Sequence, residues 1–100
     1  MRLEYRHDHG VFSAKISDKL TFSDNGLFRK LLGDIQASKA KSCVLDLLEL
    51  DVIDSSGLGM LMIAHDESKK NAYSLTLINA KGPVRQLLQI SKLDCLMNVV

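Results

Sequence analysis

The residues with the clearest chemical potential in this 100-residue chain form one polar segment, Asp54-Ser55-Ser56-Gly57-Leu58-Gly59. A carboxylate is followed by two hydroxyls, and two glycines allow another part of the backbone to approach closely. The segment lies between an apolar run at residues 43–48 and an apolar helical pattern that begins at Leu58. A serine at such a junction is expected at the positive end of a helix, where a modifying enzyme can reach it.

The same segment also has a purely structural interpretation. Either Asp54 or Ser55 would serve as the N-cap of the helix, with Gly57 and Gly59 allowing close packing on a sheet. Two observations favour a functional site instead. One cap is sufficient, yet three capping residues stand together. The following helix is also apolar on nearly all sides over residues 58–64, whereas a helix packed on one face of a sheet needs only an apolar stripe.

The apolar circumference of this helix predicts a partner. We expect some of its residues to face solvent in the free protein and to be covered in a complex, with Leu58, Met62 and Ile63 as the candidates. The surroundings are acidic, because no Lys or Arg occurs between Lys41 and Lys69. Six carboxylates fall in that interval: Asp46, Glu49, Asp51, Asp54, Asp66 and Glu67. A passive phosphate-binding loop is therefore not expected here.

Composition places the chain among ordinary globular domains, with 46% hydrophobic and 25% charged residues. We expect one domain over residues 1–100. The net charge of +1 gives no reason to expect a nucleic-acid or acidic membrane partner. No apolar stretch approaches the roughly 20 residues that span a bilayer, so direct membrane insertion is not expected. The first residues contain no apolar signal segment, which predicts a cytoplasmic protein.

Enzymatic chemistry is poorly supported, and we expect no catalytic residues. A serine hydrolase elbow needs a glycine two residues before the nucleophile, and neither Ser55 nor Ser56 has one. His65 is about two and a half helical turns beyond these serines, too far to act as their base. His7 and His9 flank a turn without further ligands, so no metal site is expected.

Other cofactor and phosphorelay chemistry is also poorly supported. Walker-type phosphate loops are absent, so no cofactor is expected. The turn Asp8-His9-Gly10 lacks the additional acidic residues that a response-regulator receiver uses to bind magnesium. Cys43 and Cys95 lack metal-binding or redox spacing and are expected to be reduced and buried.

Hydrophobic periodicity predicts an α/β domain in which strands and helices alternate. Strands are expected at residues 3–6, 11–16, 43–48 with an extension over 49–53, and 74–78; helices are expected at 25–38, 56–70 and 84–90. The first two strands form a hairpin. Ser23 or Asp24 is the expected N-cap of the first helix, and Pro83 stands in the first turn of the third. Residues 93–100 are expected to form an edge strand or a docked final segment.

The chain resembles the STAS domain family, in particular the single-domain bacterial anti-sigma factor antagonists. The resemblance rests on the N-terminal strand pair, the segment 54–59, the strand at 75–78 and the helix at 83–88. It implies a mixed β-sheet of four to five strands with three to four packed helices. By resemblance Ser55 is the phospho-acceptor, with Ser56 as runner-up, and Asp54, Ser56 and Gly57 shape the acceptor site. Partner contacts are expected at Leu58, Gly59, Met62 and Ile63.

The resemblance also implies a regulatory cycle. The unphosphorylated protein would bind an anti-sigma factor that is also a serine kinase, and this binding would free a sigma factor. Phosphorylation would release the partner, and a serine phosphatase would restore the first state. STAS domains also serve as subunits or regulators of lipid or anion transport complexes, where serine phosphorylation is not required, and this alternative stays open.

The sequence departs from the family pattern in three places. Asp18-Lys19-Leu20 and Ser91-Lys92-Leu93 each lack a glycine that is common in relatives at these points. Residue 100 also falls near the position where many relatives add a final helix, which leaves open how the C-terminal edge is covered.

Overall fold

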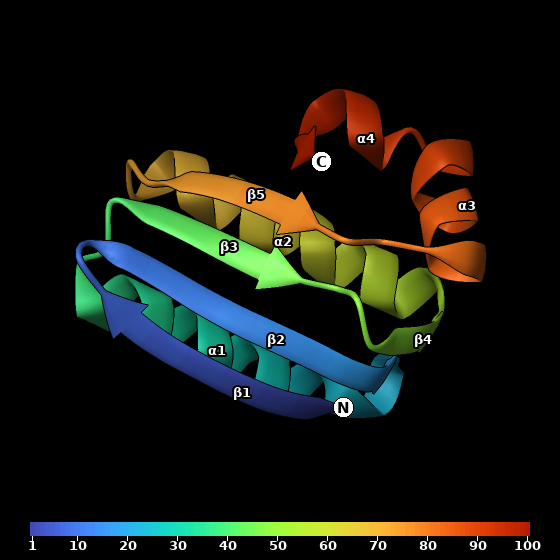
Figure 1. Cartoon of the computed structure of the whole chain (residues 1–100), viewed down its shortest axis with the longest axis horizontal. Coiled ribbons are helices and arrows are strands. Elements are labelled where there is room, and N and C mark those ends of the chain that lie inside the picture. The colour runs from blue at the N-terminus through green and yellow to red at the C-terminus, as the bar shows by residue number, and fades with distance from the viewer.

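The computed structural model describes all residues 1–100, which begin with the expected β-hairpin (Figure 1). Strands β1 (Arg2–Asp8) and β2 (Val11–Leu20) are antiparallel. His9 and Gly10 form the turn with φ angles of 51° and 78°, the left-handed conformation that tight hairpin turns require. β2 continues beyond the predicted end at residue 16, because its last residues pair with a further strand that the sequence patterns did not predict as a separate element.

The hairpin joins a mixed sheet in the order β1-β2-β3-β5-β6. β3 (Ser42–Asp46), β5 (Ser74–Ile78) and β6 (Asn98–Val99) each run parallel to their neighbours, with helical crossovers between them. The predicted α/β class with a STAS-type mixed sheet is therefore confirmed.

The predicted continuous strand over residues 43–53 is instead two strands. β3 ends at Asp46, whose Oδ1 accepts a hydrogen bond of 3.0 Å from the Leu48 amide. After this turn, β4 (Leu50–Ile53) leaves β3 and pairs in parallel with the end of β2. The sheet consequently has six strands and not the four to five expected, because this segment supplies two and the tail supplies β6. Hydrophobicity alone did not separate β3 from β4, since buried leucines stand on both sides of the break.

Four α-helices accompany the sheet: α1 (Asn25–Ser38), α2 (Ser55–Lys70), α3 (Gly82–Ile90) and the short α4 (Leu93–Leu96). Figure 1 shows α1 and α2 behind the sheet, and α3 and α4 beyond the carboxyl end of β5. The core lies between the sheet and the two long helices. Alternate residues of β2, namely Phe12, Ala14 and Ile16, are buried there, as period-2 alternation requires. No helix of the structure combines the length and apolar character needed to cross a membrane.

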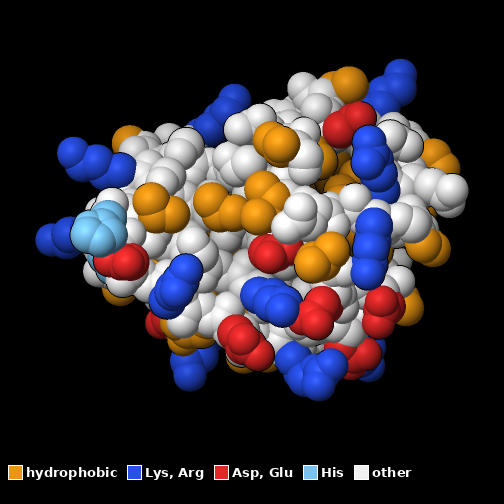
Figure 2. Space-filling view, in the orientation of Figure 1, with side chains coloured by type: hydrophobic (Ala, Val, Ile, Leu, Met, Phe, Trp, Pro, Cys, Tyr) orange, Lys and Arg blue, Asp and Glu red, His pale blue; other side chains and the backbone are white.

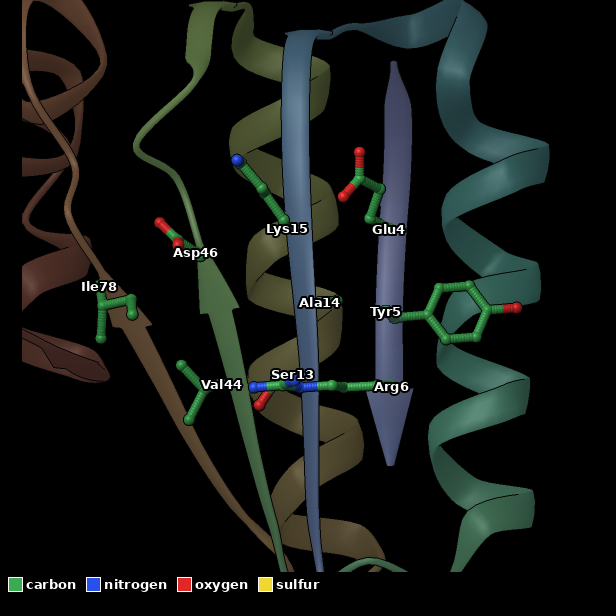
Figure 3. A pocket seen from close by; sticks show the side chains of 9 residues that line it. All are labelled: Glu4, Tyr5, Arg6, Ser13, Ala14, Lys15, Val44, Asp46 and Ile78. Carbon is green, nitrogen blue, oxygen red and sulfur yellow. The ribbon is translucent and has the colours of Figure 1, made fainter. Parts of the chain in front are cut away.

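The opposite face of the sheet carries no helix and faces the viewer in Figure 2. It contains a shallow hollow of about 470 Å³, shown in Figure 3. Val44 and Ile78 line its apolar part, and Lys15 and Asp46 lie beside them. The ring of Tyr5 points away from this hollow toward α1, where its hydroxyl donates to Asp34 Oδ2 at 3.0 Å.

The tail completes the sheet without a long final helix. α4 is followed by β6, and the Val100 amide donates to the Leu77 carbonyl oxygen at 2.9 Å. Both expected forms of the tail therefore occur, a docked segment and an edge strand. The two segments that lack the glycine common in relatives each contain a residue in the left-handed conformation: Asp18 and Lys92 adopt φ angles of 74° and 62°. Glycine accommodates this conformation without steric cost, whereas other L-residues do not.

Candidate functional site

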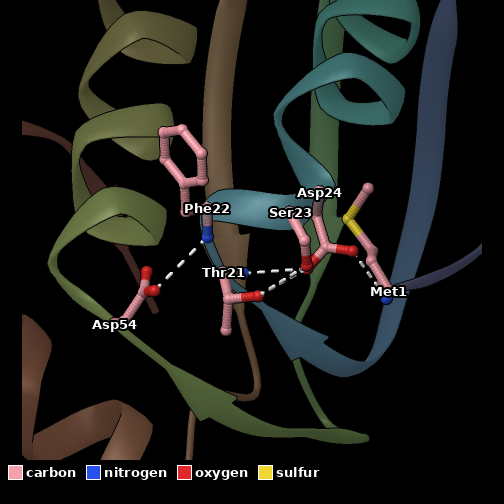
Figure 4. A network of polar contacts seen from close by, with 6 residues as sticks. All are labelled: Met1, Thr21, Phe22, Ser23, Asp24 and Asp54. Atoms are coloured by element: carbon pink, nitrogen blue, oxygen red, sulfur yellow. Dashed lines mark hydrogen bonds and ion pairs between the residues drawn. The ribbon is translucent and has the colours of Figure 1, made fainter.

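Asp54 is the N-cap of α2 and joins two separate segments of the chain. Its Oδ1 accepts a hydrogen bond of 2.8 Å from the Gly57 amide, as an N-cap side chain does at the third helical residue. Its Oδ2 accepts a hydrogen bond of 3.3 Å from the Phe22 amide, which lies 32 residues earlier in the chain (Figure 4). Asp54 rather than Ser55 is therefore the cap, and its second oxygen holds the β2–α1 connection beside the start of α2.

Ser55 is the first residue of α2 and is exposed to solvent. Ser56 follows and is half-buried. Neither hydroxyl takes part in a hydrogen bond within the chain, so both are chemically free, but Ser55 is the more accessible. The first amides of α2 point out of the helix at the same place, which gives the site a positive partial charge.

Gly57 is buried, and it brings the start of α2 against the sheet. A Cβ added at this position would overlap the carbonyl oxygen of Leu20 and lie 2.7 Å from Ile53 Cγ1. Gly59 has no such neighbour, because nothing lies within 4 Å of its added Cβ. The two glycines therefore differ: the first is needed for close packing, and the second leaves an uncovered point on α2.

The apolar circumference of α2 is largely explained by core packing. Leu61 and Ala64 are buried, and Leu58 and Met62 are half-buried against the core. The expectation that part of this group faces solvent is met fully only by Ile63, which is 42% exposed. Over residues 55–64 of α2, the positions that remain open to solvent are Ser55, Gly59 and Ile63.

Phe22 is a surface residue beside this site, and the sequence patterns did not identify it. It begins a 3₁₀ turn, η1 (Phe22–Asp24), and its side chain is 72% exposed. Figure 4 shows its ring directed toward α2. One sequence feature could have identified it. Phe22 is an aromatic residue among the polar residues Thr21, Ser23 and Asp24, in a connection between elements where an aromatic side chain is not expected to be buried.

Asp24 stabilises the same turn from its other end (Figure 4). Its carboxylate accepts hydrogen bonds from the Thr21 amide at 2.8 Å and from the Met1 ammonium at 2.9 Å. Burial acts to raise the pKa of Asp24, but these bonds and the nearby positive charge together hold it below its usual value. Asp24 precedes α1 as expected, although its side chain caps η1 and makes no capping bond to α1.

The remaining candidates do not gather into a reactive centre. No group of three or more His, Cys, Asp or Glu side chains is placed to hold a metal ion. His65 is half-buried on α2, and His9 pairs with neighbouring Asp8 at 3.2 Å. Cys43 is buried, and burial raises its pKa to about 12. The expectation that Cys95 is buried is wrong, because this cysteine lies on the short exposed helix α4.

A comparison with known protein families identifies the family of this chain. The sequence profile described as STAS domain matches residues 2–100. The chain belongs to the STAS domain family.

Individual STAS relatives cover nearly the whole chain. The anti-sigma F factor antagonist of Paenibacillus polymyxa is 26% identical over 100 residues, which are 99% of this chain and 86% of that protein. The crystal structure of an anti-sigma factor antagonist from Mycobacterium paratuberculosis has a TM-score of 0.85 at 19% identity, covering 98% of this chain and 83% of that one. The Bacillus cell fate determinant SpoIIAA in its phosphorylated form has a TM-score of 0.74 at 18% identity, covering 99% and 91%. These structural similarities establish the shared fold.

Proposed function

We propose that this STAS domain is a phosphorylation-controlled protein-binding switch of the anti-sigma factor antagonist type, with Ser55 as the phospho-acceptor. The observation that carries the proposal is the exposed, unbonded hydroxyl of Ser55 at the first residue of α2. The 26% identical anti-sigma F factor antagonist supports the regulatory role. The partner is an anti-sigma factor with serine kinase activity, a serine phosphatase reverses the modification, and the cycle operates in the cytoplasm.

The unphosphorylated site suits a protein partner. Ile63 and Gly59 are exposed on the same helix as Ser55, and Leu58 and Met62 are half-buried at the edge of this surface. We assign these four residues to the partner contact. The desolvation cost of burying this surface is reduced because both carboxylate oxygens of Asp54 already accept hydrogen bonds within the chain.

Phosphorylation changes the charge of this surface rather than the fold. The kinase transfers a phosphoryl group from a nucleoside triphosphate: a bond forms between phosphorus and Ser55 Oγ, the bond to the departing diphosphate breaks, and the hydroxyl proton passes to the kinase. The product carries nearly two additional negative charges beside Asp54. The free amides of α2 stabilise them in the free protein. A partner fitted to the neutral serine must desolvate them, so it dissociates.

The acceptor assignment is tested with the partner kinase and nucleoside triphosphate. We expect Ser55→Ala to abolish incorporation of phosphate and Ser56→Ala to retain it, measured by intact-protein mass spectrometry. The reverse pattern would move the acceptor to Ser56.

The release mechanism needs a separate measurement of affinity. We expect Ser55→Glu to bind the kinase at least tenfold more weakly than Ser55→Ala, since the carboxylate introduces charge without a change of fold. Equal affinity of the two variants would contradict electrostatic release. If both variants bind a membrane transporter with equal affinity and the kinase with none, the transport alternative replaces this proposal.

A further inference from the structure

Phe22 is the most exposed of the phenylalanine and tyrosine residues, at 72%, and its backbone is held beside the proposed phospho-acceptor. The other two phenylalanines, Phe12 and Phe28, are both buried in the core. The Phe22 backbone amide is fixed 3.3 Å from the carboxylate of Asp54, the residue that precedes Ser55. An exposed phenylalanine ring contributes nothing to the core, and a single exposed apolar residue is ordinary on a protein surface. The hydrogen bond that holds Phe22 to the residue before the proposed acceptor is what points to a role in binding.

The geometry of Ser55 determines what a kinase must touch. Ser55 stands within the first turn of α2, and the Leu58 amide donates to the Asp54 carbonyl oxygen at 3.0 Å across it. Because the serine is part of a folded helix, a kinase approaches the intact surface and not an extended peptide. A specific interface covers about 800 Å² of each partner, a disc of roughly 16 Å radius. The Phe22 amide lies 3.3 Å from the carboxylate of Asp54, the residue before Ser55, so the Phe22 backbone falls inside a disc of that size centred on Ser55.

We propose that Phe22 is a contact residue for the kinase at the Ser55 site and that Asp54 is the positioning residue that holds it there. This inference rests on the proposed function and names a further contact of the same site. Aromatic side chains near the centre of an interface supply much of its affinity, because they bury a large area with little loss of side-chain freedom. Phe22 extends the docking surface from α2 onto the β2–α1 connection.

The first test measures the affinity of unphosphorylated protein for the kinase by calorimetry. We expect Phe22→Ala to weaken binding by about tenfold or more, as for an interface hot spot. The matched control is Leu96→Ala, which removes a 54% exposed apolar side chain from α4, at the β6 edge of the sheet, and is expected to bind as wild type. Circular dichroism and thermal unfolding establish that both variants are folded. Phe22→Ala binding within twofold of wild type overturns the contact.

Failure of the proposed function has a different signature. If the wild-type protein neither binds the kinase nor accepts phosphate, the function itself is wrong. If the wild-type protein does both and Phe22→Ala does so equally well, only the contact is wrong. Steady-state phosphorylation provides a second readout: loss of a docking residue in Phe22→Ala should raise KM with little change in kcat, because the residue contacts the kinase away from the reacting atoms.

The positioning role of Asp54 is tested with Asp54→Asn and a double-mutant cycle. Asparagine retains an oxygen that accepts from the Gly57 amide, but its amide nitrogen cannot accept from Phe22. We expect Asp54→Asn to reduce kinase affinity and to speed hydrogen exchange at the Phe22 amide. Its effect on affinity is expected to be much smaller in the Phe22→Ala background, because coupled residues are not additive. Full additivity, or an unchanged exchange rate at Phe22, overturns the positioning role.

Discussion

Gly57 at the start of α2 lies directly against the carbonyl oxygen of Leu20 at the end of β2. No side chain can be accommodated between them, since even a methyl group would overlap this backbone oxygen and press on Ile53. The contact fixes how closely α2, which carries the proposed phospho-acceptor, approaches the sheet. Ser55 is therefore presented on a rigid support, which is a suitable arrangement for a surface that another protein must recognise in one orientation.

Gly57→Ala is expected to lower the free energy of unfolding by about 3 kcal/mol, because the obstructing atom belongs to the backbone and cannot move aside cheaply. Urea denaturation measures the effect. Gly59→Ala is the matched control on the same helix and is expected to raise stability by about 1 kcal/mol, since alanine is the better helix former and the site is open. Similar effects of the two substitutions would contradict the close packing at Gly57.

Lys92→Gly is expected to stabilise the protein by roughly 0.5–1 kcal/mol, because Lys92 adopts a φ of 62° between α3 and α4. The same substitution at Lys81, where φ is −142°, should be neutral or destabilising, because an ordinary extended backbone gains nothing from glycine. Thermal unfolding of both variants decides the matter. A Lys92→Gly protein that melts below wild type would show that the left-handed conformation carries no cost here.

Stability is expected to fall in acid partly through Asp24. Its pKa is lower in the folded protein than in the unfolded chain, so ionised Asp24 contributes stability above the unfolded pKa, near 4. That contribution is lost as the pH falls through the folded pKa. Asp24→Asn should therefore be less stable than wild type at pH 7, with the difference shrinking below about pH 4. Denaturation curves across this pH range measure the difference, and a constant gap would rule out the ionised carboxylate as its source.

The two cysteines are expected to differ strongly in reactivity. Cys43 is buried with its pKa raised to about 12, so it holds almost no thiolate at pH 8, whereas Cys95 is exposed. A thiol reagent should label one cysteine in the native protein and both in denaturant. Cys95→Ser identifies the reactive site, since it should abolish native labelling. Rapid native labelling of Cys43 would show that the sheet and its helices open readily.

The sequence predicted local structure well where hydrophobic periodicity and capping agreed. The helix over residues 25–38 and the strand over 74–78 have the predicted bounds, and α2 begins one residue before the predicted start. The separation of β3 from β4 was missed, because the apolar run does not show that the chain turns at Asp46. Whether β4 continues beside β3 or pairs with β2 depends on strand partners distant in sequence.

By itself, the sequence determined that a serine pair would stand at a strand-to-helix junction of an α/β domain, because caps, glycines and periodicity act over a few residues. Only the tertiary structure decided that Asp54 is the cap, that Ser55 is the exposed hydroxyl and that Phe22 lies beside it. These features depend on the Phe22–Asp54 hydrogen bond and the Gly57–Leu20 contact. Both join segments more than thirty residues apart, and such contacts arise from the packing of whole elements rather than from local propensity.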